Sequence, residues 1–313
     1  MKQGMRPREL RLLWEVSRTG SVTAAAERIA MTQPAASALL RELEERLGFA
    51  LFDREKRRLT FTAKGRALLP EIANALAALD SVSRLTESLR ADAPQRVVIG
   101  SVAPAAATIL PGGVRQLRES LPAALVSVRT AMSLEIESMV AEGRVDFGIV
   151  TREAGSSGPG CLRLCALPLY CVVDAAHPFA GREAVEAGDI ARENYVSLGR
   201  QFTVGGATAR LLEDTGAVHA PSVEVMHYST ACAFVRDGGC VAVLDALCTL
   251  YAPQLGLVAK PIRNAPHLSL DLLWSPHSSL AAHAQSFADG LIAALGGSQL
   301  APFFHVHPRR GGR

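Results

Sequence analysis

Residues 20–48 read GSVTAAAERIAMTQPAASALLRELEERLG, and this stretch predicts two helices joined by a tight turn. Ser21 can cap the first helix, and Thr32 can cap the second, which has Pro34 in its first turn, where a missing N–H costs nothing. Gly48 follows as the residue that ends the second helix. Two helices separated by so short a turn are typical of a helix-turn-helix.

The residues on both sides of this stretch complete a small helical domain. Before it, apolar residues within 10–17 form one face of a helix. After it, short strands at 50–52 and 59–62 enclose the charged segment 53–58, which predicts a hairpin with a basic tip. The order helix, helix, turn, helix and hairpin is that of a winged helix-turn-helix.

The charge of the chain is concentrated at its start. Residues 1–66 hold 14 lysines and arginines against 8 acids, a net charge of +6, whereas the rest of the chain carries −3. A basic segment of this kind predicts contact with a polyanion such as nucleic acid. A solvated surface would give the same charge count, so the charge alone does not identify a nucleic-acid-binding segment. It adds to the evidence from the helix-turn-helix pattern.

In a helix-turn-helix the first turn of the second helix enters the major groove of DNA. The residues predicted to lie there are Thr32, Gln33, Pro34, Ala35 and Ser37, with Arg41 one turn further along the same face. A glutamine can make two hydrogen bonds to adenine, and small side chains permit close approach. The hairpin adds basic residues suited to phosphate or the minor groove, namely Arg54, Lys56, Arg57 and Arg58. Each residue alone would also serve as a helix cap or a surface charge.

Residues 64–90 predict one long helix. Apolar residues recur every three or four positions along it, at Leu69, Ile72, Leu76, Leu79, Val82, Leu85 and Leu89. At 1.5 Å per residue this helix is a rod of roughly 40 Å. Its apolar seam has no evident partner in the small domain before it. A second copy of the chain would bury the seam by coiled-coil-like pairing, which the pattern favours over packing on the body of the same chain.

Beyond a hinge at 91–95, strands and helices alternate, which predicts an open, mostly parallel sheet. The first series has strands at 96–102, 124–129 and 146–150 and helices at 109–120 and 133–142. The second series has strands at 195–198, 223–225 and 241–244 and helices at 204–214 and 229–237, before a final helix at 280–295. Two long apolar strands, 162–174 and 268–274, join the series. This arrangement predicts two lobes with a cleft between them.

We therefore expect four parts. They are a DNA-binding domain at 5–65, a linker helix and hinge at 66–93, an effector domain at 94–300 and a frayed tail at 301–313. Within the effector domain, lobe I spans about 95–168 and 268–297, and lobe II spans about 169–267.

Composition and motifs exclude several classes of protein. The chain has 313 residues, of which 49% are apolar, enough to fill a core. No apolar run reaches the 18 or so residues that span a bilayer, and the first residues do not resemble a signal peptide, so we expect a cytoplasmic protein. Signatures of P-loop, serine-hydrolase and zinc-protease enzymes are missing. The histidines at 177, 219, 227, 267, 277 and 283 show no metal-ligand spacing, and the pair His305 and His307 in the tail is more typical of a solvated tail than of a metal site. We expect no enzyme activity, no cofactor and no metal.

The six cysteines, at 161, 165, 171, 232, 240 and 248, form no C-x-x-C pair. In a reducing compartment such residues are typically small buried hydrophobes. Sensing of oxidants through these thiols is the alternative.

The N-terminal motifs resemble those of LysR-type transcriptional regulators. The matching segments are 20–27 (GSVTAAAE), 32–37 (TQPAAS), 41–44 (RELE), 47–48 (LG), 51–54 (LFDR) and 61–65 (FTAKG), with Lys64 and the strongly basic hairpin as departures. Length, linker helix and two-lobed region extend the resemblance over nearly the whole chain. Residues 229–233 and 238–245 are similar to the subgroup that regulates lysine synthesis and opine catabolism.

The resemblance implies an α/β protein with an all-α winged helix-turn-helix, a long linker helix and a two-lobed domain like a periplasmic binding protein. It also implies a homodimer or homotetramer that binds double-stranded promoter DNA and a small-molecule effector. An enzyme or transport-type binding protein with an incidental helical cap is the competing class. A steep loss of DNA affinity with salt would exclude it.

Ligands of open α/β sheets bind beyond the carboxyl ends of the strands. Family members commonly use a Ser or Thr after the first strand and a polar residue at the second lobe's first helix, which carries over to Ser101 and Thr203. The same edge adds Val102, Thr151, Gln201 and His227. Free N–H groups at helix starts suit a carboxylate, so we expect a small anion or an amino-acid-like zwitterion. Any one of these residues would also serve as a helix cap.

Overall fold

The computed structural model describes residues 4–53, 59–90, 96–153, 160–216, 220–275, 278 and 280–296. The chain divides into two compact units. The first holds residues 1–93 and two short segments, 141–144 and 277–279, and the second holds most of the remaining chain. The predicted tail at 301–313, the hinge and the hairpin tip at 54–58 lie outside the described residues.

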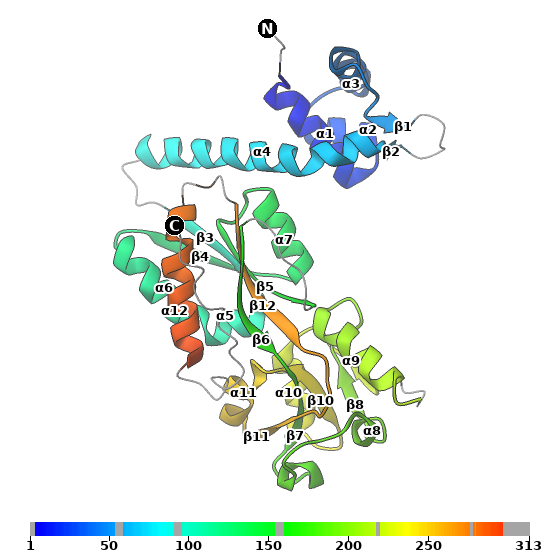
Figure 1. Ribbon diagram of the computed structural model, residues 1–313, viewed down its shortest axis with the longest axis vertical. Helices are drawn as coiled ribbons and strands as arrows, with labels where there is room; N and C mark the ends of the chain where they lie inside the picture. The colour runs from blue at the N-terminus through cyan, green and yellow to red at the C-terminus, as the bar shows by residue number, and fades with distance from the viewer. Residues whose placement is uncertain are drawn as a thin grey trace, which may run out of the picture. The chain divides into compact units, whose positions relative to one another are not determined.

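The first unit is helical, apart from two short antiparallel strands (Figure 1). Its elements are α1 (Pro7–Thr19), α2 (Val22–Arg28), α3 (Gln33–Leu47), β1 (Phe52–Asp53), β2 (Thr60–Phe61) and α4 (Ala63–Arg90). Ser21 caps α2 as predicted, because its Oγ accepts a hydrogen bond from the Ala24 amide at 3.4 Å. Thr32 occupies the cap position of α3 but makes no side-chain capping bond. Gly48 ends α3 with a φ of 76°, a conformation that costs glycine little.

The core of the first unit takes one face from each helix. Its buried apolar side chains are Leu12, Leu13, Val16, Ala25, Ala26, Ala36, Leu40, Leu43, Leu51, Phe52, Ile72 and Leu76. The last two belong to α4, so the expectation that the small domain offers the seam of this helix no partner is wrong for its first half. Leu79 and Val82 further along the seam are exposed. The side chains of Leu85 and Leu89 lie outside the described part of the chain.

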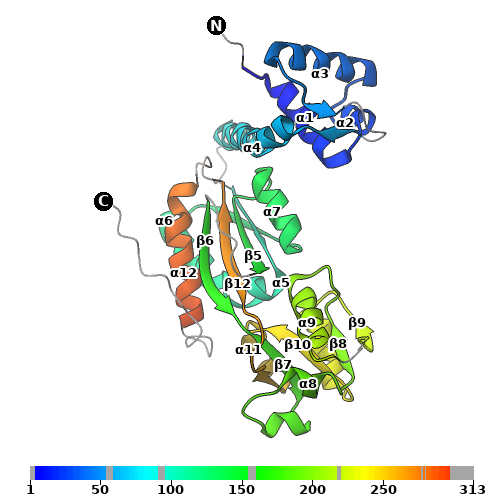
Figure 2. The ribbon, with the colours of Figure 1, turned by 45° about the vertical axis from the view of Figure 1, so that its right-hand side comes forward.

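The second unit contains two five-stranded sheets (Figures 1 and 2). The first has the order β4-β3-β5-β12-β6, with bounds Leu125–Thr130, Arg96–Ser101, Phe147–Glu153, Leu268–Trp274 and Cys161–Leu167. The second has the order β11-β7-β10-β8-β9, with bounds Leu257–Pro261, Leu169–Asp174, Val241–Asp245, Tyr195–Ser197 and Val223–Glu224. Each sheet has two parallel and two antiparallel pairings, so both sheets are mixed and not mostly parallel as expected.

Helices cover these sheets. With the first sheet lie α5 (Ala103–Thr108), α6 (Leu110–Ser120), α7 (Ser133–Ala141), η3 (Ala281–His283) and α12 (Ala284–Gly296). With the second lie η1 (Pro178–Gly181), α8 (Ala187–Ile190), α9 (Thr203–Glu213), α10 (Tyr228–Arg236), α11 (Cys248–Tyr251) and η2 (Ala252–Leu255). The helix expected at 109–120 corresponds to α6, and a separate short helix, α5, precedes it. The chain restarts at Leu110 because Pro111 cannot donate to the preceding turn.

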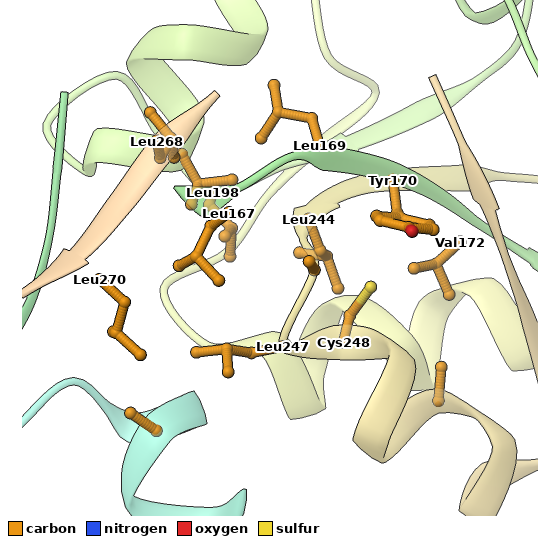
Figure 3. Packing of buried hydrophobic residues seen from close by; sticks show 14 of the residues in the cluster. Leu167, Leu169, Tyr170, Val172, Leu198, Leu244, Leu247, Cys248, Leu268 and Leu270 are labelled. Atoms are coloured by element: carbon orange, nitrogen blue, oxygen red, sulfur yellow. The ribbon is translucent and has the colours of Figure 1, made fainter. Parts of the chain in front are cut away.

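The two sheets are joined at a shared apolar core. The segment predicted at 162–174 does cross, since β6 belongs to the first sheet and β7 to the second. The other predicted crossing strand, β12, lies wholly in the first sheet, and the chain returns through residues 262–267 instead. Figure 3 shows the side chains at this junction, among them Leu167, Leu169, Leu244, Leu247, Leu268 and Leu270. In the described part of the chain, no helix has the length and apolar character to cross a membrane.

Candidate DNA interface and effector cleft

The first turn of α3 is on the surface of the first unit. Thr32, Gln33, Pro34 and Ala35 are exposed, whereas Ala36 is buried in the core. Arg41 is also exposed, and Ser37 is half-buried. The structure thus places every described member of the predicted recognition set at the surface.

Three of these residues are linked along one face of α3. Gln33 Nε2 donates to Ser37 Oγ at 3.0 Å, and Arg41 Nε donates to the Ser37 carbonyl at 3.3 Å. Residues spaced by four lie above one another on a helix, so the three polar groups form a single stripe. The predicted hairpin residues Arg54, Lys56, Arg57 and Arg58 lie outside the described residues.

A buried ion pair fixes α3 against α1. Glu9 is 1% exposed, and its Oε2 accepts from Arg46 Nη2 at 2.6 Å and from the Arg6 amide at 2.7 Å. Burial alone would raise the pKa of Glu9, but these hydrogen bonds lower it overall, so the carboxylate stays charged. No local sequence pattern indicates this pair, because its members are 37 residues apart.

The second unit contains a cleft of about 810 Å³, lined by strand ends of the first sheet and by helices and loops of both lobes. Five of the predicted effector residues line it, namely Val102, Thr151, Gln201, Thr203 and His227. Ser101 does not. It is fully buried at the end of β3, and its hydroxyl donates to the Val102 carbonyl at 3.0 Å. Val102, the next residue and the N-cap of α5, lines the cleft instead.

Helices of both lobes begin at the cleft. Ser133, Thr203 and Tyr228 are the first residues of α7, α9 and α10, and all three line it. Two bonds join the lobes along one side. Thr203 Oγ1 donates to the Thr151 carbonyl at 3.1 Å, and Arg210 Nη2 donates to Glu153 Oε1 at 2.6 Å.

The cleft also contains charged residues that sequence reasoning missed. Arg152 and Glu137 line it and form an ion pair with Nε and Oε1 2.8 Å apart, and Arg210 pairs with Glu153. Arg200 lines it as well and pairs with Glu213. For Arg152 and Glu153 the available signal was the polar run that follows Val150, because β5 continues to Glu153 and does not end at 150.

A buried carboxylate lies beneath one wall of the cleft. Asp245, 1% exposed at the end of β10, accepts from the Tyr228 hydroxyl at 2.7 Å and from the Leu247 amide at 3.0 Å. Burial raises the pKa of Asp245 to about 6 despite both bonds. Burial also raises the pKa of the Tyr228 hydroxyl well above its usual value, so it stays protonated and donates.

The cysteines are free thiols, and four of the six are buried. Burial raises the pKa of all of them, to about 12 for Cys165 and Cys171 and to about 11 for Cys232. Since the thiolate is the reactive form, these environments disfavour oxidation. The structure therefore gives no support to the thiol-sensing alternative.

Comparisons with known proteins agree with both parts of this description. Residues 7–66 match the model of bacterial regulatory helix-turn-helix proteins of the lysR family, and residues 90–296 match the LysR substrate binding domain. The transcriptional activator protein LysR of Escherichia coli K12 is 26% identical over 288 residues, which cover 92% of this chain and 93% of that protein. The HTH-type transcriptional regulator IlvR of Caulobacter vibrioides is 33% identical over 172 residues, 54% of this chain and 58% of that protein.

Solved structures share the fold. A full-length OxyR variant from Pseudomonas aeruginosa has a TM-score of 0.60 at 19% identity, covering 98% of this chain and all of that one. Full-length CbnR in complex with its target DNA has a TM-score of 0.53 at 17% identity, covering 93% of this chain and all of that one. The matched families are transcriptional regulators and not enzymes. This chain belongs to the LysR family of DNA-binding transcriptional regulators, with an N-terminal helix-turn-helix domain and a C-terminal effector-binding domain.

Proposed function

We propose that this regulator reads promoter DNA with the first turns of α3 and changes its DNA binding when a small anion or an amino-acid-like zwitterion occupies the cleft. The observation that carries the proposal is the polar stripe of exposed Gln33, half-buried Ser37 and exposed Arg41 on a helix whose opposite face is buried. A helix of this kind can enter the major groove without loss of its packing.

The DNA contacts divide by chemistry. Gln33 suits adenine, Ser37 and Thr32 suit a base or a phosphate, and Arg41 suits guanine or a phosphate. Pro34 and Ala35 permit close approach. The hairpin residues Arg54, Lys56, Arg57 and Arg58 are proposed to hold the DNA backbone without reading sequence.

The effector contacts come from both lobes. The cleft volume lies in the range of small-molecule sites, and the starts of α7, α9 and α10 offer N–H groups to an anion. Val102, Thr151, Gln201, Thr203 and His227 are the proposed contacts. Ser101 is left out because its side chain does not reach the cleft.

The regulator is proposed to act as a homodimer or homotetramer. Leu79 and Val82, the exposed apolar residues of the α4 seam that the structure describes, support pairing with a second copy. Pairing would also place two recognition helices on one duplex, which suits operators with two half-sites.

Footprinting on the chain's own upstream region tests the proposal. We expect a protected site whose extent changes when compounds found by thermal shift are added. A ligand alters an equilibrium only through different affinities for the two states, so a compound that binds but leaves the footprint unchanged contradicts the effector half. A protein that protects no DNA contradicts the whole proposal.

A further inference from the structure

The charges that line the effector cleft are balanced. The described lining holds three arginines (Arg152, Arg200, Arg210) and three glutamates (Glu135, Glu137, Glu153). Two of the arginines pair with glutamates of the same lining, at 2.8 Å and 2.6 Å. An anionic ligand that bound the arginine of one of these pairs would leave the paired glutamate without a partner. A cationic ligand that bound the glutamate would leave the paired arginine without one.

The two ion pairs differ in exposure. Arg210 and Glu153 have side chains that are 55% and 64% exposed, so water and salt screen their interaction. Arg152 and Glu137 are 21% and 30% exposed, and they lie on elements of one lobe, β5 and α7. The Arg152–Glu137 pair is therefore the better-defined site for a charged ligand.

Arg152 has interaction partners away from the cleft in addition to Glu137. Its Nη1 donates to Cys161 Sγ at 3.7 Å, and Cys161 Sγ lies 3.9 Å from Oδ2 of Asp271, which is fully buried. The negative charges of Glu137 and Asp271 both favour the charged guanidinium, and the pKa of Arg152 is raised even though burial alone would lower it. Arg152 thus keeps its place and its charge when Glu137 turns to another partner.

We infer that the effector is a zwitterion whose carboxylate binds Arg152 and whose ammonium group binds Glu137. The ligand enters between the two members of an existing ion pair, so that one internal pair is exchanged for two intermolecular ones and no charge is left alone. This inference rests on the proposed function, because it assigns a chemical class to the ligand of the same cleft.

The test uses the full chain and matched probe compounds. Each L-amino acid of a panel, the standard ones together with diamino acids, is compared with the 2-oxo acid and the amine of the same carbon skeleton. Affinities are measured by thermal shift and calorimetry. We expect the best amino acid to bind at least about tenfold more tightly than either counterpart, since charged hydrogen bonds contribute at least that factor.

Three variants locate the contacts. Glu137→Gln should weaken binding of the amino acid about tenfold, because the ammonium contact is lost. It should not weaken binding of the 2-oxo acid, which has no ammonium group and no longer leaves a charged Glu137 without a partner. Arg152→Gln should weaken binding of both the amino acid and the 2-oxo acid, because each binds Arg152 through its carboxylate. Asp189→Asn is the matched control, since Asp189 pairs with Arg182 at 2.7 Å outside the cleft lining, and we expect no change with it.

Several results would overturn the inference: a 2-oxo acid or an amine that binds best, a panel in which no amino acid binds, or a Glu137→Gln variant that weakens acid and amino acid alike. These outcomes leave the proposed function standing if another compound changes the footprint. A footprint that no compound of any class changes counts against the proposed function instead.

Discussion

Gln33 donates one hydrogen bond within α3, to Ser37, and its carboxamide oxygen is left as an acceptor. The bond holds the amide on the exposed face of the helix and limits its rotamers before DNA arrives. A preset side chain loses less entropy on binding than a free one. An adenine presents a matching donor and acceptor in the major groove.

We predict that Gln33→Ala relaxes sequence choice at one operator position and costs about 1–3 kcal/mol on the preferred base. Affinities for a set of operator variants, measured by anisotropy at fixed salt, check this. Gln254→Ala, which alters an exposed glutamine of η2, is the control. If Gln33→Ala ranks all operator variants as wild type does, the recognition helix is misplaced.

Asp245 is a buried acid whose described partners are neutral. Tyr228 and the Leu247 amide bond to it, and the thiols of Cys165 and Cys248 lie near enough to interact with it electrostatically. Its pKa rises from 3.8 to about 6 on folding because burial disfavours the charge. Between these two values the folded state binds the proton that the unfolded state releases.

The unfolding free energy should therefore fall as pH rises from about 4 to 7, by roughly 3 kcal/mol from this group. Asp245→Asn removes that part of the dependence. Urea denaturation of both proteins across this range is the measurement, and the variant should gain stability relative to wild type as pH rises. Parallel pH profiles would show that Asp245 does not titrate there.

At the scale of elements, α6 and α12 pack together through glycines (Figure 2). A Cβ on Gly290 would lie 2.5 Å from the Gln116 Cβ, and one on Gly113 would lie 2.6 Å from Leu291 Cδ2. Sequence periodicity predicts both helices, but it cannot show which faces approach so closely, because the partners are over 170 residues apart along the chain.

Gly290→Ala should therefore destabilise the second unit by about 1–3 kcal/mol, less any gain in helix propensity. Gly296→Ala is the control, because nothing lies within 4 Å of a Cβ added there. Thermal or chemical denaturation distinguishes the two. Equal stability of both variants would contradict the close packing of these helices.

The apolar seam of helix α4 is buried at some positions and exposed at others. Ile72 and Leu76 are buried in the first unit, while Leu79 is 37% and Val82 63% exposed. The regular spacing of apolar residues predicts the seam, but it cannot assign each part of the seam to a partner, since both kinds of packing need the same pattern.

Val82→Glu should weaken self-association at least tenfold, because a carboxylate in a paired seam is desolvated and faces its own copy. Ser83→Glu changes the adjacent, exposed position and should leave association intact. Sedimentation over a concentration series measures both. Unchanged association of Val82→Glu would mean that the second half of α4 is not the pairing surface.

At the scale of the molecule, features that depend on neighbouring residues were predicted from the sequence, and features that depend on distant residues were not. Caps, glycine ends and 3–4 spacing predicted the helices of the first unit, because each depends on neighbours in the chain. The strand order and the antiparallel pairing of β12 with β5 and β6 depend on partners about 100 residues away. Local alternation cannot report them.

The candidate site shows the same division. Strand ends and helix starts predicted five residues of the cleft, whereas Ser101 was misjudged because the side of β3 that faces the cleft is set by packing. The Arg152–Glu137 pair was missed because ion pairing across elements leaves no pattern in sequence.

The central claim is that occupation of the cleft and DNA binding by α3 are energetically coupled. The most direct measurement is of both affinities in both states: DNA with and without the effector, and effector with and without DNA. The first ratio compares DNA affinity with and without effector, and the second compares effector affinity with and without DNA. Thermodynamic linkage predicts that the two ratios are equal, and a coupling of about 5–150-fold is typical. An effector that binds the cleft while both ratios stay at one would contradict the account.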